Sequence, residues 1–217
     1  MPTFFCCSDT HGKSPPNYPE RDLDGWLHAG DVCDKLWVGR PLPKSNNVME
    51  IRDWVSSRTK PVCAVHGNHD TFDGAKFFAA CHDITGSVIE VAGVRIVGVG
   101  WCGMDFADLP GNPELQSVAN DCLRIFNRFS DMKPVVLLMH YPFLSPDGEI
   151  KSVPLRDLVN DLRPVAVVQG HLHEWAATHY RFDAGKFSSL VLNPSSAGML
   201  LRISESGAEC HLAEHRH

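Results

Sequence analysis

Short apolar stretches, separated by polar segments rich in glycine and proline, recur along the whole chain. They are rich in β-branched residues and too short for typical helices, which favours buried strands. The predicted strands are residues 3–7, 25–29, 61–65, 95–99, 134–139 and 164–168. A hairpin is predicted over 88–97 with its turn at Gly93, and the segment after residue 175 alternates apolar runs with turn residues. An antiparallel layer is therefore expected to close the chain.

Three other segments repeat apolar residues at the spacing of an α-helix. They are residues 46–58, 112–129 and 153–163. In the second of these, Asn112 is a candidate N-cap and Pro113 takes the first helical position, which favours helix initiation. Because strands alternate with helices before strands follow alone, the pattern predicts an α/β (α+β) fold of sheets flanked by helices.

The composition indicates one globular unit. The 217 residues are 43% hydrophobic and no linker or internal repeat divides them, so a single domain over 1–217 is expected. The net charge of −6 disfavours binding to bulk nucleic acid or to anionic membranes. No apolar stretch approaches the roughly 20 residues of a membrane helix, and the first residues do not resemble a signal peptide. We therefore expect a cytoplasmic protein whose cysteines are thiols.

Polar residues of a few types directly follow five of the predicted strands. They are aspartates, histidines and one asparagine, several of them next to a glycine. In chain order they are Asp9, His11, Asp31, Asp34, Asn68, His69, His140, His171 and His173. Because open α/β sheets place ligands at the carboxyl ends of their strands, we expect these side chains to form one cluster.

The chemistry of this cluster indicates metal ions. Imidazole and carboxylate groups bind Mn, Fe, Co, Ni and Zn, and the five stretches contain no thiol apart from Cys33. The donors are too many for one ion, so two divalent ions are expected, with manganese favoured. In an extended segment His171 and His173 would lie about 6–7 Å apart on one side, which suits one imidazole on each of two ions about 3.5–4 Å apart.

The same residues form five short motifs in a fixed order. The motifs read D-x-H from residue 9, G-D-x-x-D from residue 30, G-N-H-D from residue 67, a histidine at 140, and G-H-x-H from residue 170. Together they resemble the motifs of the calcineurin-like metallophosphoesterases. The resemblance implies a two-sheet β-sandwich flanked by helices, a two-metal site and a metal-dependent phosphoesterase activity.

The resemblance also implies a role for each of these residues. The implied ligands of one metal are Asp9, His11 and His173, those of the other are Asn68, His140 and His171, and the bridging ligand is Asp31. His69 would contact the phosphate and protonate the leaving group, and Asp34 would orient His69. The implied reaction is in-line attack on phosphorus by a hydroxide that bridges the two metals.

Two departures from related enzymes bear on the substrate. Lys35 and Leu36 follow Asp34, and Asp70 follows His69, where protein serine/threonine phosphatases have Arg-Gly and Glu. A phosphoprotein substrate is therefore less expected than a small phosphate ester, with phosphodiesterase activity favoured over phosphomonoesterase activity. The alternative is a non-catalytic protein-binding scaffold of the same fold, and the retained His69 and metal ligands argue against it.

Two other features have more ordinary interpretations. His28 lies within a predicted strand, so packing in the core or support of the site from behind is expected. Gly98, Gly100 and Gly103 have the spacing of a dinucleotide-binding fingerprint, but glycine and proline follow instead of an apolar-faced helix. A loop near the metal pocket, with Trp101 at its rim, is the favoured interpretation.

Overall fold

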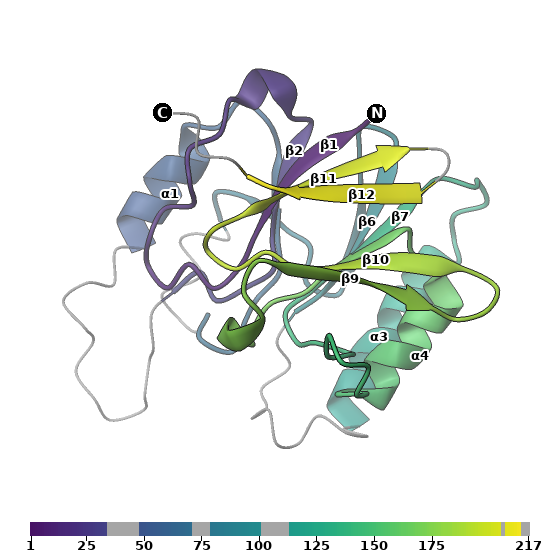
Figure 1. Cartoon of the computed structure of the whole chain (residues 1–217). Helices are drawn as coiled ribbons and strands as arrows, with labels where there is room; N and C mark the ends of the chain where they lie inside the picture. Colours follow the sequence, from purple (N-terminus) through teal and green to yellow (C-terminus); the bar gives the residue numbers. More distant parts are fainter. Residues whose placement is uncertain (34–47, 71–78, 101–112, 205–206, 214–217) are drawn as a thin grey trace.

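The computed structural model describes residues 1–33, 48–70, 79–100, 113–204 and 207–213. Two mixed sheets of six strands each form the framework, and helices flank them (Figure 1). This confirms the expected α/β (α+β) fold with a two-sheet sandwich.

The first sheet has the strand order β12-β11-β1-β2-β3-β4. Its strands are β1 (Thr3–Cys7), β2 (Gly25–His28), β3 (Val62–Ala64), β4 (His82–Asp83), β11 (Met199–Ser204) and β12 (Gly207–Leu212). The strands β1 to β4 run parallel to one another, whereas β11 pairs antiparallel with both β1 and β12. The carboxyl ends of β1, β2 and β3 therefore lie at the same edge of the sheet.

The second sheet has the strand order β5-β6-β7-β8-β10-β9. Its strands are β5 (Ser87–Val91), β6 (Val94–Val99), β7 (Val135–Met139), β8 (Ala166–Val168), β9 (Thr178–Asp183) and β10 (Ser188–Asn193). The four central strands are parallel, and β5 and β9 are antiparallel strands at the two edges. As in the first sheet, the carboxyl ends of the parallel strands meet at one edge.

Alternate residues of the strands supply the core between the two sheets. Side chains of both sheets contribute to it, among them Phe4, Leu27, Ile96, Leu138 and Leu192. All five are at most 4% exposed. Burying one such side chain typically stabilises a fold by about 1.5–3 kcal/mol, so this layer holds the two strand-end edges at a fixed spacing.

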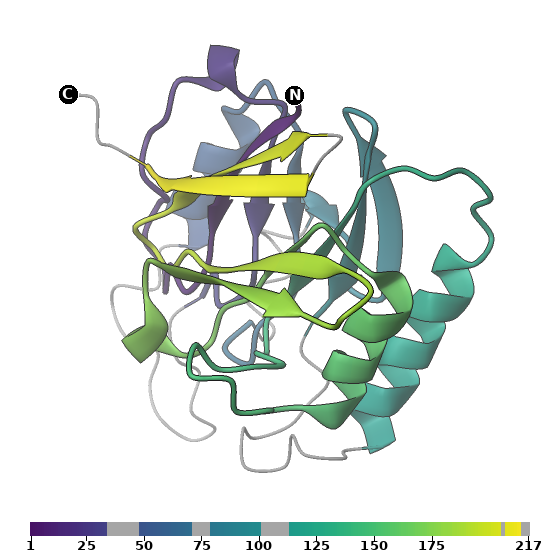
Figure 2. The same cartoon turned by 45° about the vertical axis from the view of Figure 1, so that its right-hand side comes forward.

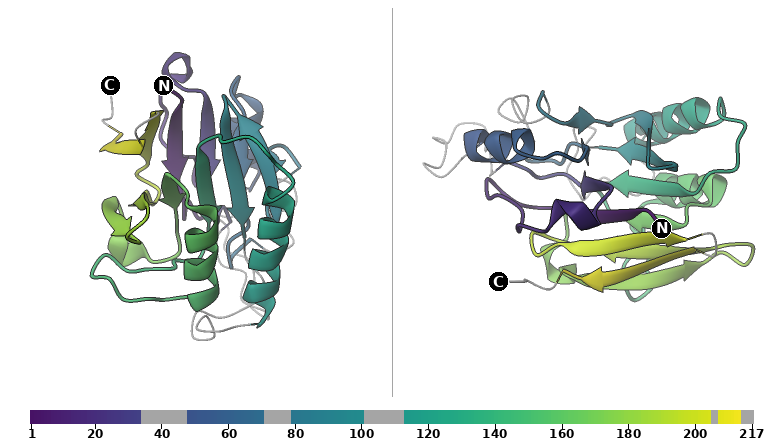
Figure 3. Two further views of the ribbon diagram at one scale, coloured as in Figure 1. Left: turned by 90° about the vertical axis from the view of Figure 1, so that its right-hand side faces the viewer. Right: turned by 90° about the horizontal axis from the view of Figure 1, so that it is seen from above.

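Helices cover the outer faces of the sandwich. The helices α3 (Pro113–Phe126) and α4 (Val153–Leu162) pack side by side over the second sheet, as Figure 2 shows. The helix α1 (Val48–Ser56) lies on the opposite side, against the first sheet (Figure 3). Two single-turn helices, η1 (Glu20–Asp22) and η3 (His173–Trp175), lie in loops. No described helix is long and apolar enough to cross a bilayer.

The residues at the two ends of α4 explain where this helix begins and ends. The Ser152 hydroxyl accepts a hydrogen bond from the Leu155 backbone N–H, 3.4 Å away, and Pro154 occupies the first turn, where its missing N–H costs nothing. The helix ends at Leu162, and its C-cap Arg163 has a left-handed backbone and is followed by Pro164. The helix thus begins and ends where local chemistry directs it.

The hairpin of β5 and β6 confirms the one predicted over 88–97. Val91 pairs with Val94, and the two turn residues Ala92 and Gly93 have φ angles of 50° and 79°. Two left-handed residues form the turn type that matches the twist of adjacent strands.

The closing strands differ from the single antiparallel layer that the sequence predicts. β9 and β10 join the second sheet, whereas β11 and β12 join the first. The apolar pattern of a strand indicates which face is buried but not which strand is its partner. The segment between β10 and β11 therefore passes from one sheet to the other.

The glycine-rich fingerprint does not form a nucleotide-binding turn at its first position. Gly98 lies inside β6, and a Cβ atom there would approach the Ile84 carbonyl oxygen to 2.1 Å. The glycine therefore permits close packing of neighbouring backbones. Trp101 and Gly103 lie outside the described residues.

Candidate metal centre

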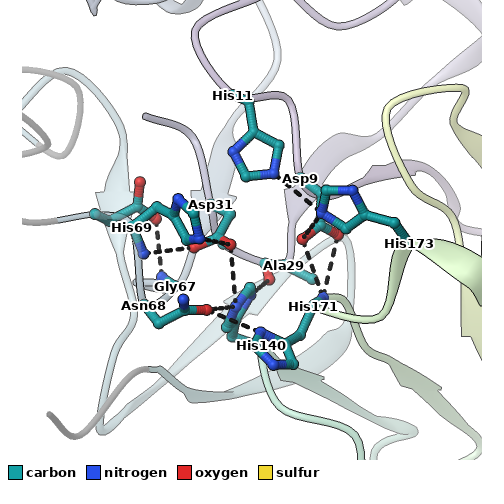
Figure 4. Close-up of polar contacts among 12 residues, drawn as sticks. Asp9, His11, Ala29, Asp31, Gly67, Asn68, His69, His140, His171 and His173 are labelled. Atoms are coloured by element: carbon teal, nitrogen blue, oxygen red, sulfur yellow. Dashed lines mark hydrogen bonds and ion pairs between the residues drawn. The ribbon is translucent and has the colours of Figure 1, made fainter. Parts of the chain in front are cut away.

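The loops that follow β1, β2, β3, β7 and β8 meet at one edge of the sandwich, as Figure 4 shows. They bring together every predicted site residue that the structure describes: Asp9, His11, Asp31, Asn68, His69, His140, His171 and His173. Asp34 lies outside the described residues. The cluster expected from the strand-end pattern therefore forms from both sheets.

Three of these residues form an outer group: Asp9, His11 and His173. Their nearest ligand atoms all lie within 4.8 Å of one another. The Nε2 atoms of His11 and His173 are 3.1 Å apart, and His173 Nε2 is 3.6 Å from Asp9 Oδ1. Two imidazoles and one carboxylate thus point at a common position near the surface.

A second set of three forms an inner group: Asn68, His140 and His171. The side-chain oxygen of Asn68 lies 2.9 Å from His140 Nε2 and 2.8 Å from His171 Nδ1. This set is the more deeply buried, and the side chain of His140 is fully shielded from solvent.

Asp31 lies between the two groups. Its carboxylate shares a 4.8 Å cluster with His140 and His171 of the inner group, and another with His11 of the outer group. One of its oxygens, Oδ2, is 3.5 Å from His140 Nε2. The position between the groups is the one that a bridging ligand requires.

The donor set fits divalent metal ions. Imidazole nitrogen, carboxylate oxygen and amide oxygen are ligands of intermediate transition metals. Two ligands at right angles on an ion with bonds of about 2.1 Å are separated by about 3 Å. The separation of 3.1 Å in the outer group and those of 2.8 and 2.9 Å in the inner group match this value. Each group could therefore hold one ion.

The backbone of the centre is strained. Asp9, His11, Asp31 and His171 have φ angles of 51°, 46°, 55° and 73°. Residues with a Cβ atom rarely adopt this left-handed region, and such strain is typically found at functional sites. Backbone hydrogen bonds hold it here, since the Asp9 N–H donates to the Gly30 carbonyl oxygen at 2.9 Å.

Two glycines of the motifs are needed because the loops touch. A Cβ atom at Gly67 would lie 2.2 Å from Asp31 Oδ1. Gly30 has a φ of 90°, and a Cβ atom there would lie 2.7 Å from His140 Nδ1. The glycines before Asp31 and Asn68 therefore let the loops after β2 and β3 close on the same space.

Backbone carbonyl groups fix the orientation of two histidines. A carbonyl oxygen only accepts, so His140 Nδ1 donates to Ala29 at 2.8 Å and His11 Nδ1 donates to Cys33 at 3.2 Å. In both residues the Nε2 atom is left to face the centre. Such contacts set the tautomer of a metal-binding histidine and its direction.

The protonation of two ligands, His171 and Asp9, suits cation binding. Burial, together with the neighbouring charge of His140, lowers the pKa of His171 to about 4, so His171 is a neutral imidazole near pH 7. Burial alone would raise the pKa of Asp9, but its hydrogen bond with His173 and the charge of His140 outweigh this and hold the pKa well below its usual range. Asp9 is therefore an anionic ligand. The hydrogen bond with Asp9 raises the pKa of His173. Burial alone would lower the pKa of His140, but the charges of Asp31 and Asp9 outweigh burial and raise it, so a cation would displace protons from these two histidines.

Of the two roles expected for His28, core packing and support of the site, its hydrogen bonds show the second. Its Nδ1 accepts from the Gly30 N–H at 3.2 Å, so its Nε2–H donates to the Thr10 hydroxyl at 3.0 Å. Burial lowers its pKa to about 4, which keeps this neutral tautomer. His28 thereby ties the loop after β1 to the loop after β2.

Asp70 has a role that the sequence did not reveal. It is buried and accepts hydrogen bonds from the backbone N–H groups of Gly67 at 2.8 Å and Cys33 at 2.9 Å. Burial and the nearby charge of Asp31 raise its pKa to about 6. Asp70 thus joins the loops after β2 and β3. This structural role explains why an acidic residue follows the G-N-H motif, and it does not require Asp70 to bind substrate.

His69 lies beside the ligands. Its backbone N–H donates to Asp31 Oδ1 at 2.8 Å, and its ring Nε2 is 3.7 Å from Asp31 Oδ2. The rings of His69 and His11 meet edge to face with centroids 4.9 Å apart. This position allows contact with a substrate held at the centre.

Comparison with known proteins identifies the family. A sequence model of the calcineurin-like phosphoesterases matches residues 2–175 of this chain. None of the curated proteins compared with the chain matches it. The matched segment includes every residue of the outer and inner groups.

Solved structures share the fold at low sequence identity. The chain is similar to TT1561 of Thermus thermophilus, with a TM-score of 0.65 and 17% identity over 98% of this chain and 99% of that one. It is also similar to GAP50 of Plasmodium, described as the anchor in the inner membrane complex, with a TM-score of 0.52 and 12% identity over 96% and 83% of the two chains. These likenesses concern the fold alone.

Proposed function

This chain belongs to the calcineurin-like phosphoesterase family, and from that premise we propose that it is a two-metal hydrolase of small phosphodiesters. The family and the clustered ligands support a metal-dependent phosphoesterase. The observation that carries the two-metal assignment is the position of Asp31 between two ligand groups with donor spacings suited to one ion each.

Different residues have different roles in the proposed hydrolysis. The bound ions would supply a nucleophilic water at neutral pH and stabilise negative charge on the phosphate. The Asp31 carboxylate fixes the spacing of the two ligand groups. His69, held next to Asp31, is placed to donate a proton to the leaving oxygen as the bond to phosphorus breaks and the new bond to the water oxygen forms.

A cavity next to η3, the turn that begins with His173, supports a small substrate. It has a volume of about 500 Å³, and Glu174 and Trp175 of η3 line it. Its lining includes Asp147, Glu149, Glu174, Lys151 and the ring of Trp175, and Lys151 Nζ is 2.5 Å from Glu149. The acidic excess repels a polyanion, whereas Trp175 offers a flat apolar surface to one substituent of a diester.

The charge of the whole chain agrees with this choice of substrate. A formal net charge of −6 opposes binding to the backbone of DNA or RNA, which depends on neutralising several phosphates. We therefore propose a small phosphate ester as the partner. Manganese is the proposed metal among Mn, Fe, Zn, Co and Ni.

The experiment that tests this function compares two generic substrates. The full chain is stripped with a chelator, reloaded with Mn²⁺, and assayed on bis-p-nitrophenyl phosphate and on p-nitrophenyl phosphate. We expect no turnover without metal, recovery with Mn²⁺, and the faster rate on the diester. A faster rate on the monoester would reverse the substrate preference.

The rival function is a scaffold, since GAP50, which shares the fold, is described as an anchor. A scaffold would bind Mn²⁺ weakly or not at all and would hydrolyse neither substrate at any metal concentration. The complete ligand set and the retained His69 support the enzyme instead. Equal, near-background rates with and without Mn²⁺ would therefore favour the scaffold.

A further inference from the structure

A polar network lies next to the segment that carries His171 and contributes no ligand to the metal centre. We call it the Gln169 network, and its members are Gln169, Tyr180, Asn193 and Thr178. Gln169 is fully buried and follows directly after β8, immediately before Gly170 and His171. A polar side chain at this depth must find partners in the protein.

The amide nitrogen of Gln169 has three acceptors within reach. It lies 3.1 Å from the Leu144 carbonyl oxygen, 3.1 Å from the Tyr180 hydroxyl and 2.9 Å from Asn193 Oδ1. The Leu144 carbonyl only accepts, so it fixes which end of the amide is the nitrogen. The Tyr180 hydroxyl also donates to Leu144, at 2.5 Å.

The network continues from Asn193 to the outer group. The side-chain nitrogen of Asn193 donates to the Thr178 hydroxyl at 3.0 Å, and that hydroxyl donates to the Trp175 carbonyl oxygen at 2.5 Å. Trp175 is the last residue of η3, which His173 begins. The branch through Asn193 and Thr178 therefore holds the turn that carries His173.

The other branch holds the segment of His140. Leu144, which accepts from both Gln169 and Tyr180, lies in the loop that starts at His140. The Gly170 N–H also donates to the His140 carbonyl oxygen at 3.0 Å. Three segments that carry His140, His171 and His173 are thus fastened to one buried amide.

The energetics of Gln169 argue against a purely stabilising role. Its side-chain oxygen is buried and has no hydrogen-bond partner among the described residues. An unsatisfied buried acceptor typically costs about 1–3 kcal/mol, which an apolar residue of similar size would avoid. A glutamine at this position therefore indicates that its amide nitrogen is needed to space the three segments.

We propose that Gln169 is a positioning residue that sets the spacing of the three histidine-bearing segments and so the affinity of both metal sites. This inference rests on the two-metal function proposed above. The Tyr180 branch positions the inner group, and the Thr178 branch positions the outer group.

The test measures metal binding rather than turnover. The chelated full chain is titrated calorimetrically with Mn²⁺, and Gln169→Met is compared with the wild-type chain. Loss of a residue that orients metal ligands typically lowers metal affinity about 10–100-fold, so a loss of that size is expected at both sites. The thermal midpoint of the metal-free variant should fall modestly, because the unsatisfied Gln169 oxygen leaves but the buried Asn193 oxygen loses its donor.

Two control variants separate positioning from general loss of stability. Gln116→Met makes the same exchange on the exposed face of α3, where the Gln116 amide donates to Asn120, and should leave both affinities unchanged. Leu158→Ala removes a buried contact of α4 and should lower the thermal midpoint with little effect on Mn²⁺ affinity.

The two branches give a sharper comparison. Thr178→Val removes the hydroxyl that binds the Trp175 carbonyl, so it should weaken mainly the outer site. Tyr180→Phe removes the donor to Leu144 and should weaken mainly the inner site. Both are near-isosteric, so they remain informative if Gln169→Met does not fold.

The outcomes are distinct for the two proposals. Unchanged Mn²⁺ affinities in Gln169→Met, Thr178→Val and Tyr180→Phe would overturn the positioning role while leaving the two-metal function intact. Affinity losses no larger than those of a Leu158→Ala variant of equal stability would also overturn it. A wild-type chain that binds no Mn²⁺ would overturn the metal centre and this inference together, whereas a chain that binds Mn²⁺ without hydrolysis would overturn the activity alone.

Discussion

The inner and outer ligand groups lie in opposite surroundings. The side chain of His140 in the inner group is 0% exposed, whereas that of His173 in the outer group is 61% exposed. His140 is fixed by the Ala29 carbonyl oxygen, and His173 lies in a single-turn helix at the surface. Fixed ligand orientation and shielding from solvent both affect how a metal is bound. On the two-metal proposal, the inner group would therefore hold its ion more tightly than the outer group.

The largest expected effect comes from the residue that the two groups share. Asp31→Asn removes an anionic oxygen from both groups, so both Mn²⁺ equivalents should be lost together. Without them, hydrolysis should fall about 10³-fold, since bound ions supply several kcal/mol of charge stabilisation. Elemental analysis of the dialysed protein measures the metal.

The matched control for Asp31 is Asp53→Asn, an exposed position on α1. It should keep both equivalents and full activity. If Asp31→Asn retained two equivalents, the bridge between the groups would be wrong and the comparison of two linked sites would fail.

The next effect separates chemistry from metal binding. His69→Ala should keep both Mn²⁺ equivalents, because His69 lies beside the groups rather than within either. A general acid typically contributes about 10²–10⁴-fold, and an alkoxide needs protonation more than a nitrophenolate does. We therefore expect a large loss on alkyl esters and a much smaller one on nitrophenyl esters, measured as the ratio of kcat/KM values.

Equal losses on the two kinds of leaving group would reject the acid role and leave His69 as a contact to the phosphate. A loss of metal would instead place His69 among the ligands, as the 4.8 Å cluster of His11, Asp31 and His69 would allow.

The smallest expected effect is the difference in Mn²⁺ affinity between the buried inner group and the exposed outer group. Removing one ligand from each group, with His140→Ala and His173→Ala, should lower Mn²⁺ affinity by at least the roughly 10–100-fold typical of losing a residue that only orients a ligand, and by more in the inner group than in the outer group. Calorimetric titration of the chelated variants resolves the two events. Equal losses would show that burial does not distinguish the two groups.

The strand-end pattern predicted the cluster of candidate ligands because its rule is local. Each ligand follows a recognisable apolar strand, and parallel strands bring their carboxyl ends to one edge. What the pattern could not supply is the backbone conformation: nothing in the composition of the loop at Asp9 or His171 indicates a left-handed residue with a Cβ atom. That strain is held by contacts from other loops.

The sequence pattern does not predict the residues that support the ligands, because their contacts also come from other loops. Asp70 acts through N–H groups of two separate loops, and Gln169 acts through Leu144 and Asn193, which are distant in sequence. Polar residues of this kind carry no periodic signal. The split of the closing strands between two sheets also depends on long-range pairing, which an apolar pattern does not specify.

The place of β1 has a consequence for how the protein is made. β1 lies between β2 and β11, so residues near the amino terminus pair with 199–202, almost the whole chain away. During synthesis one side of β1 can pair with β2 early, while its other side waits for β11 to leave the ribosome. An open strand edge invites pairing with other chains, and contacts of such sequence separation form slowly. A nascent chain that stops before Met199 keeps this edge exposed, so the first sheet is completed only after the residues of β11 and β12 have been synthesised.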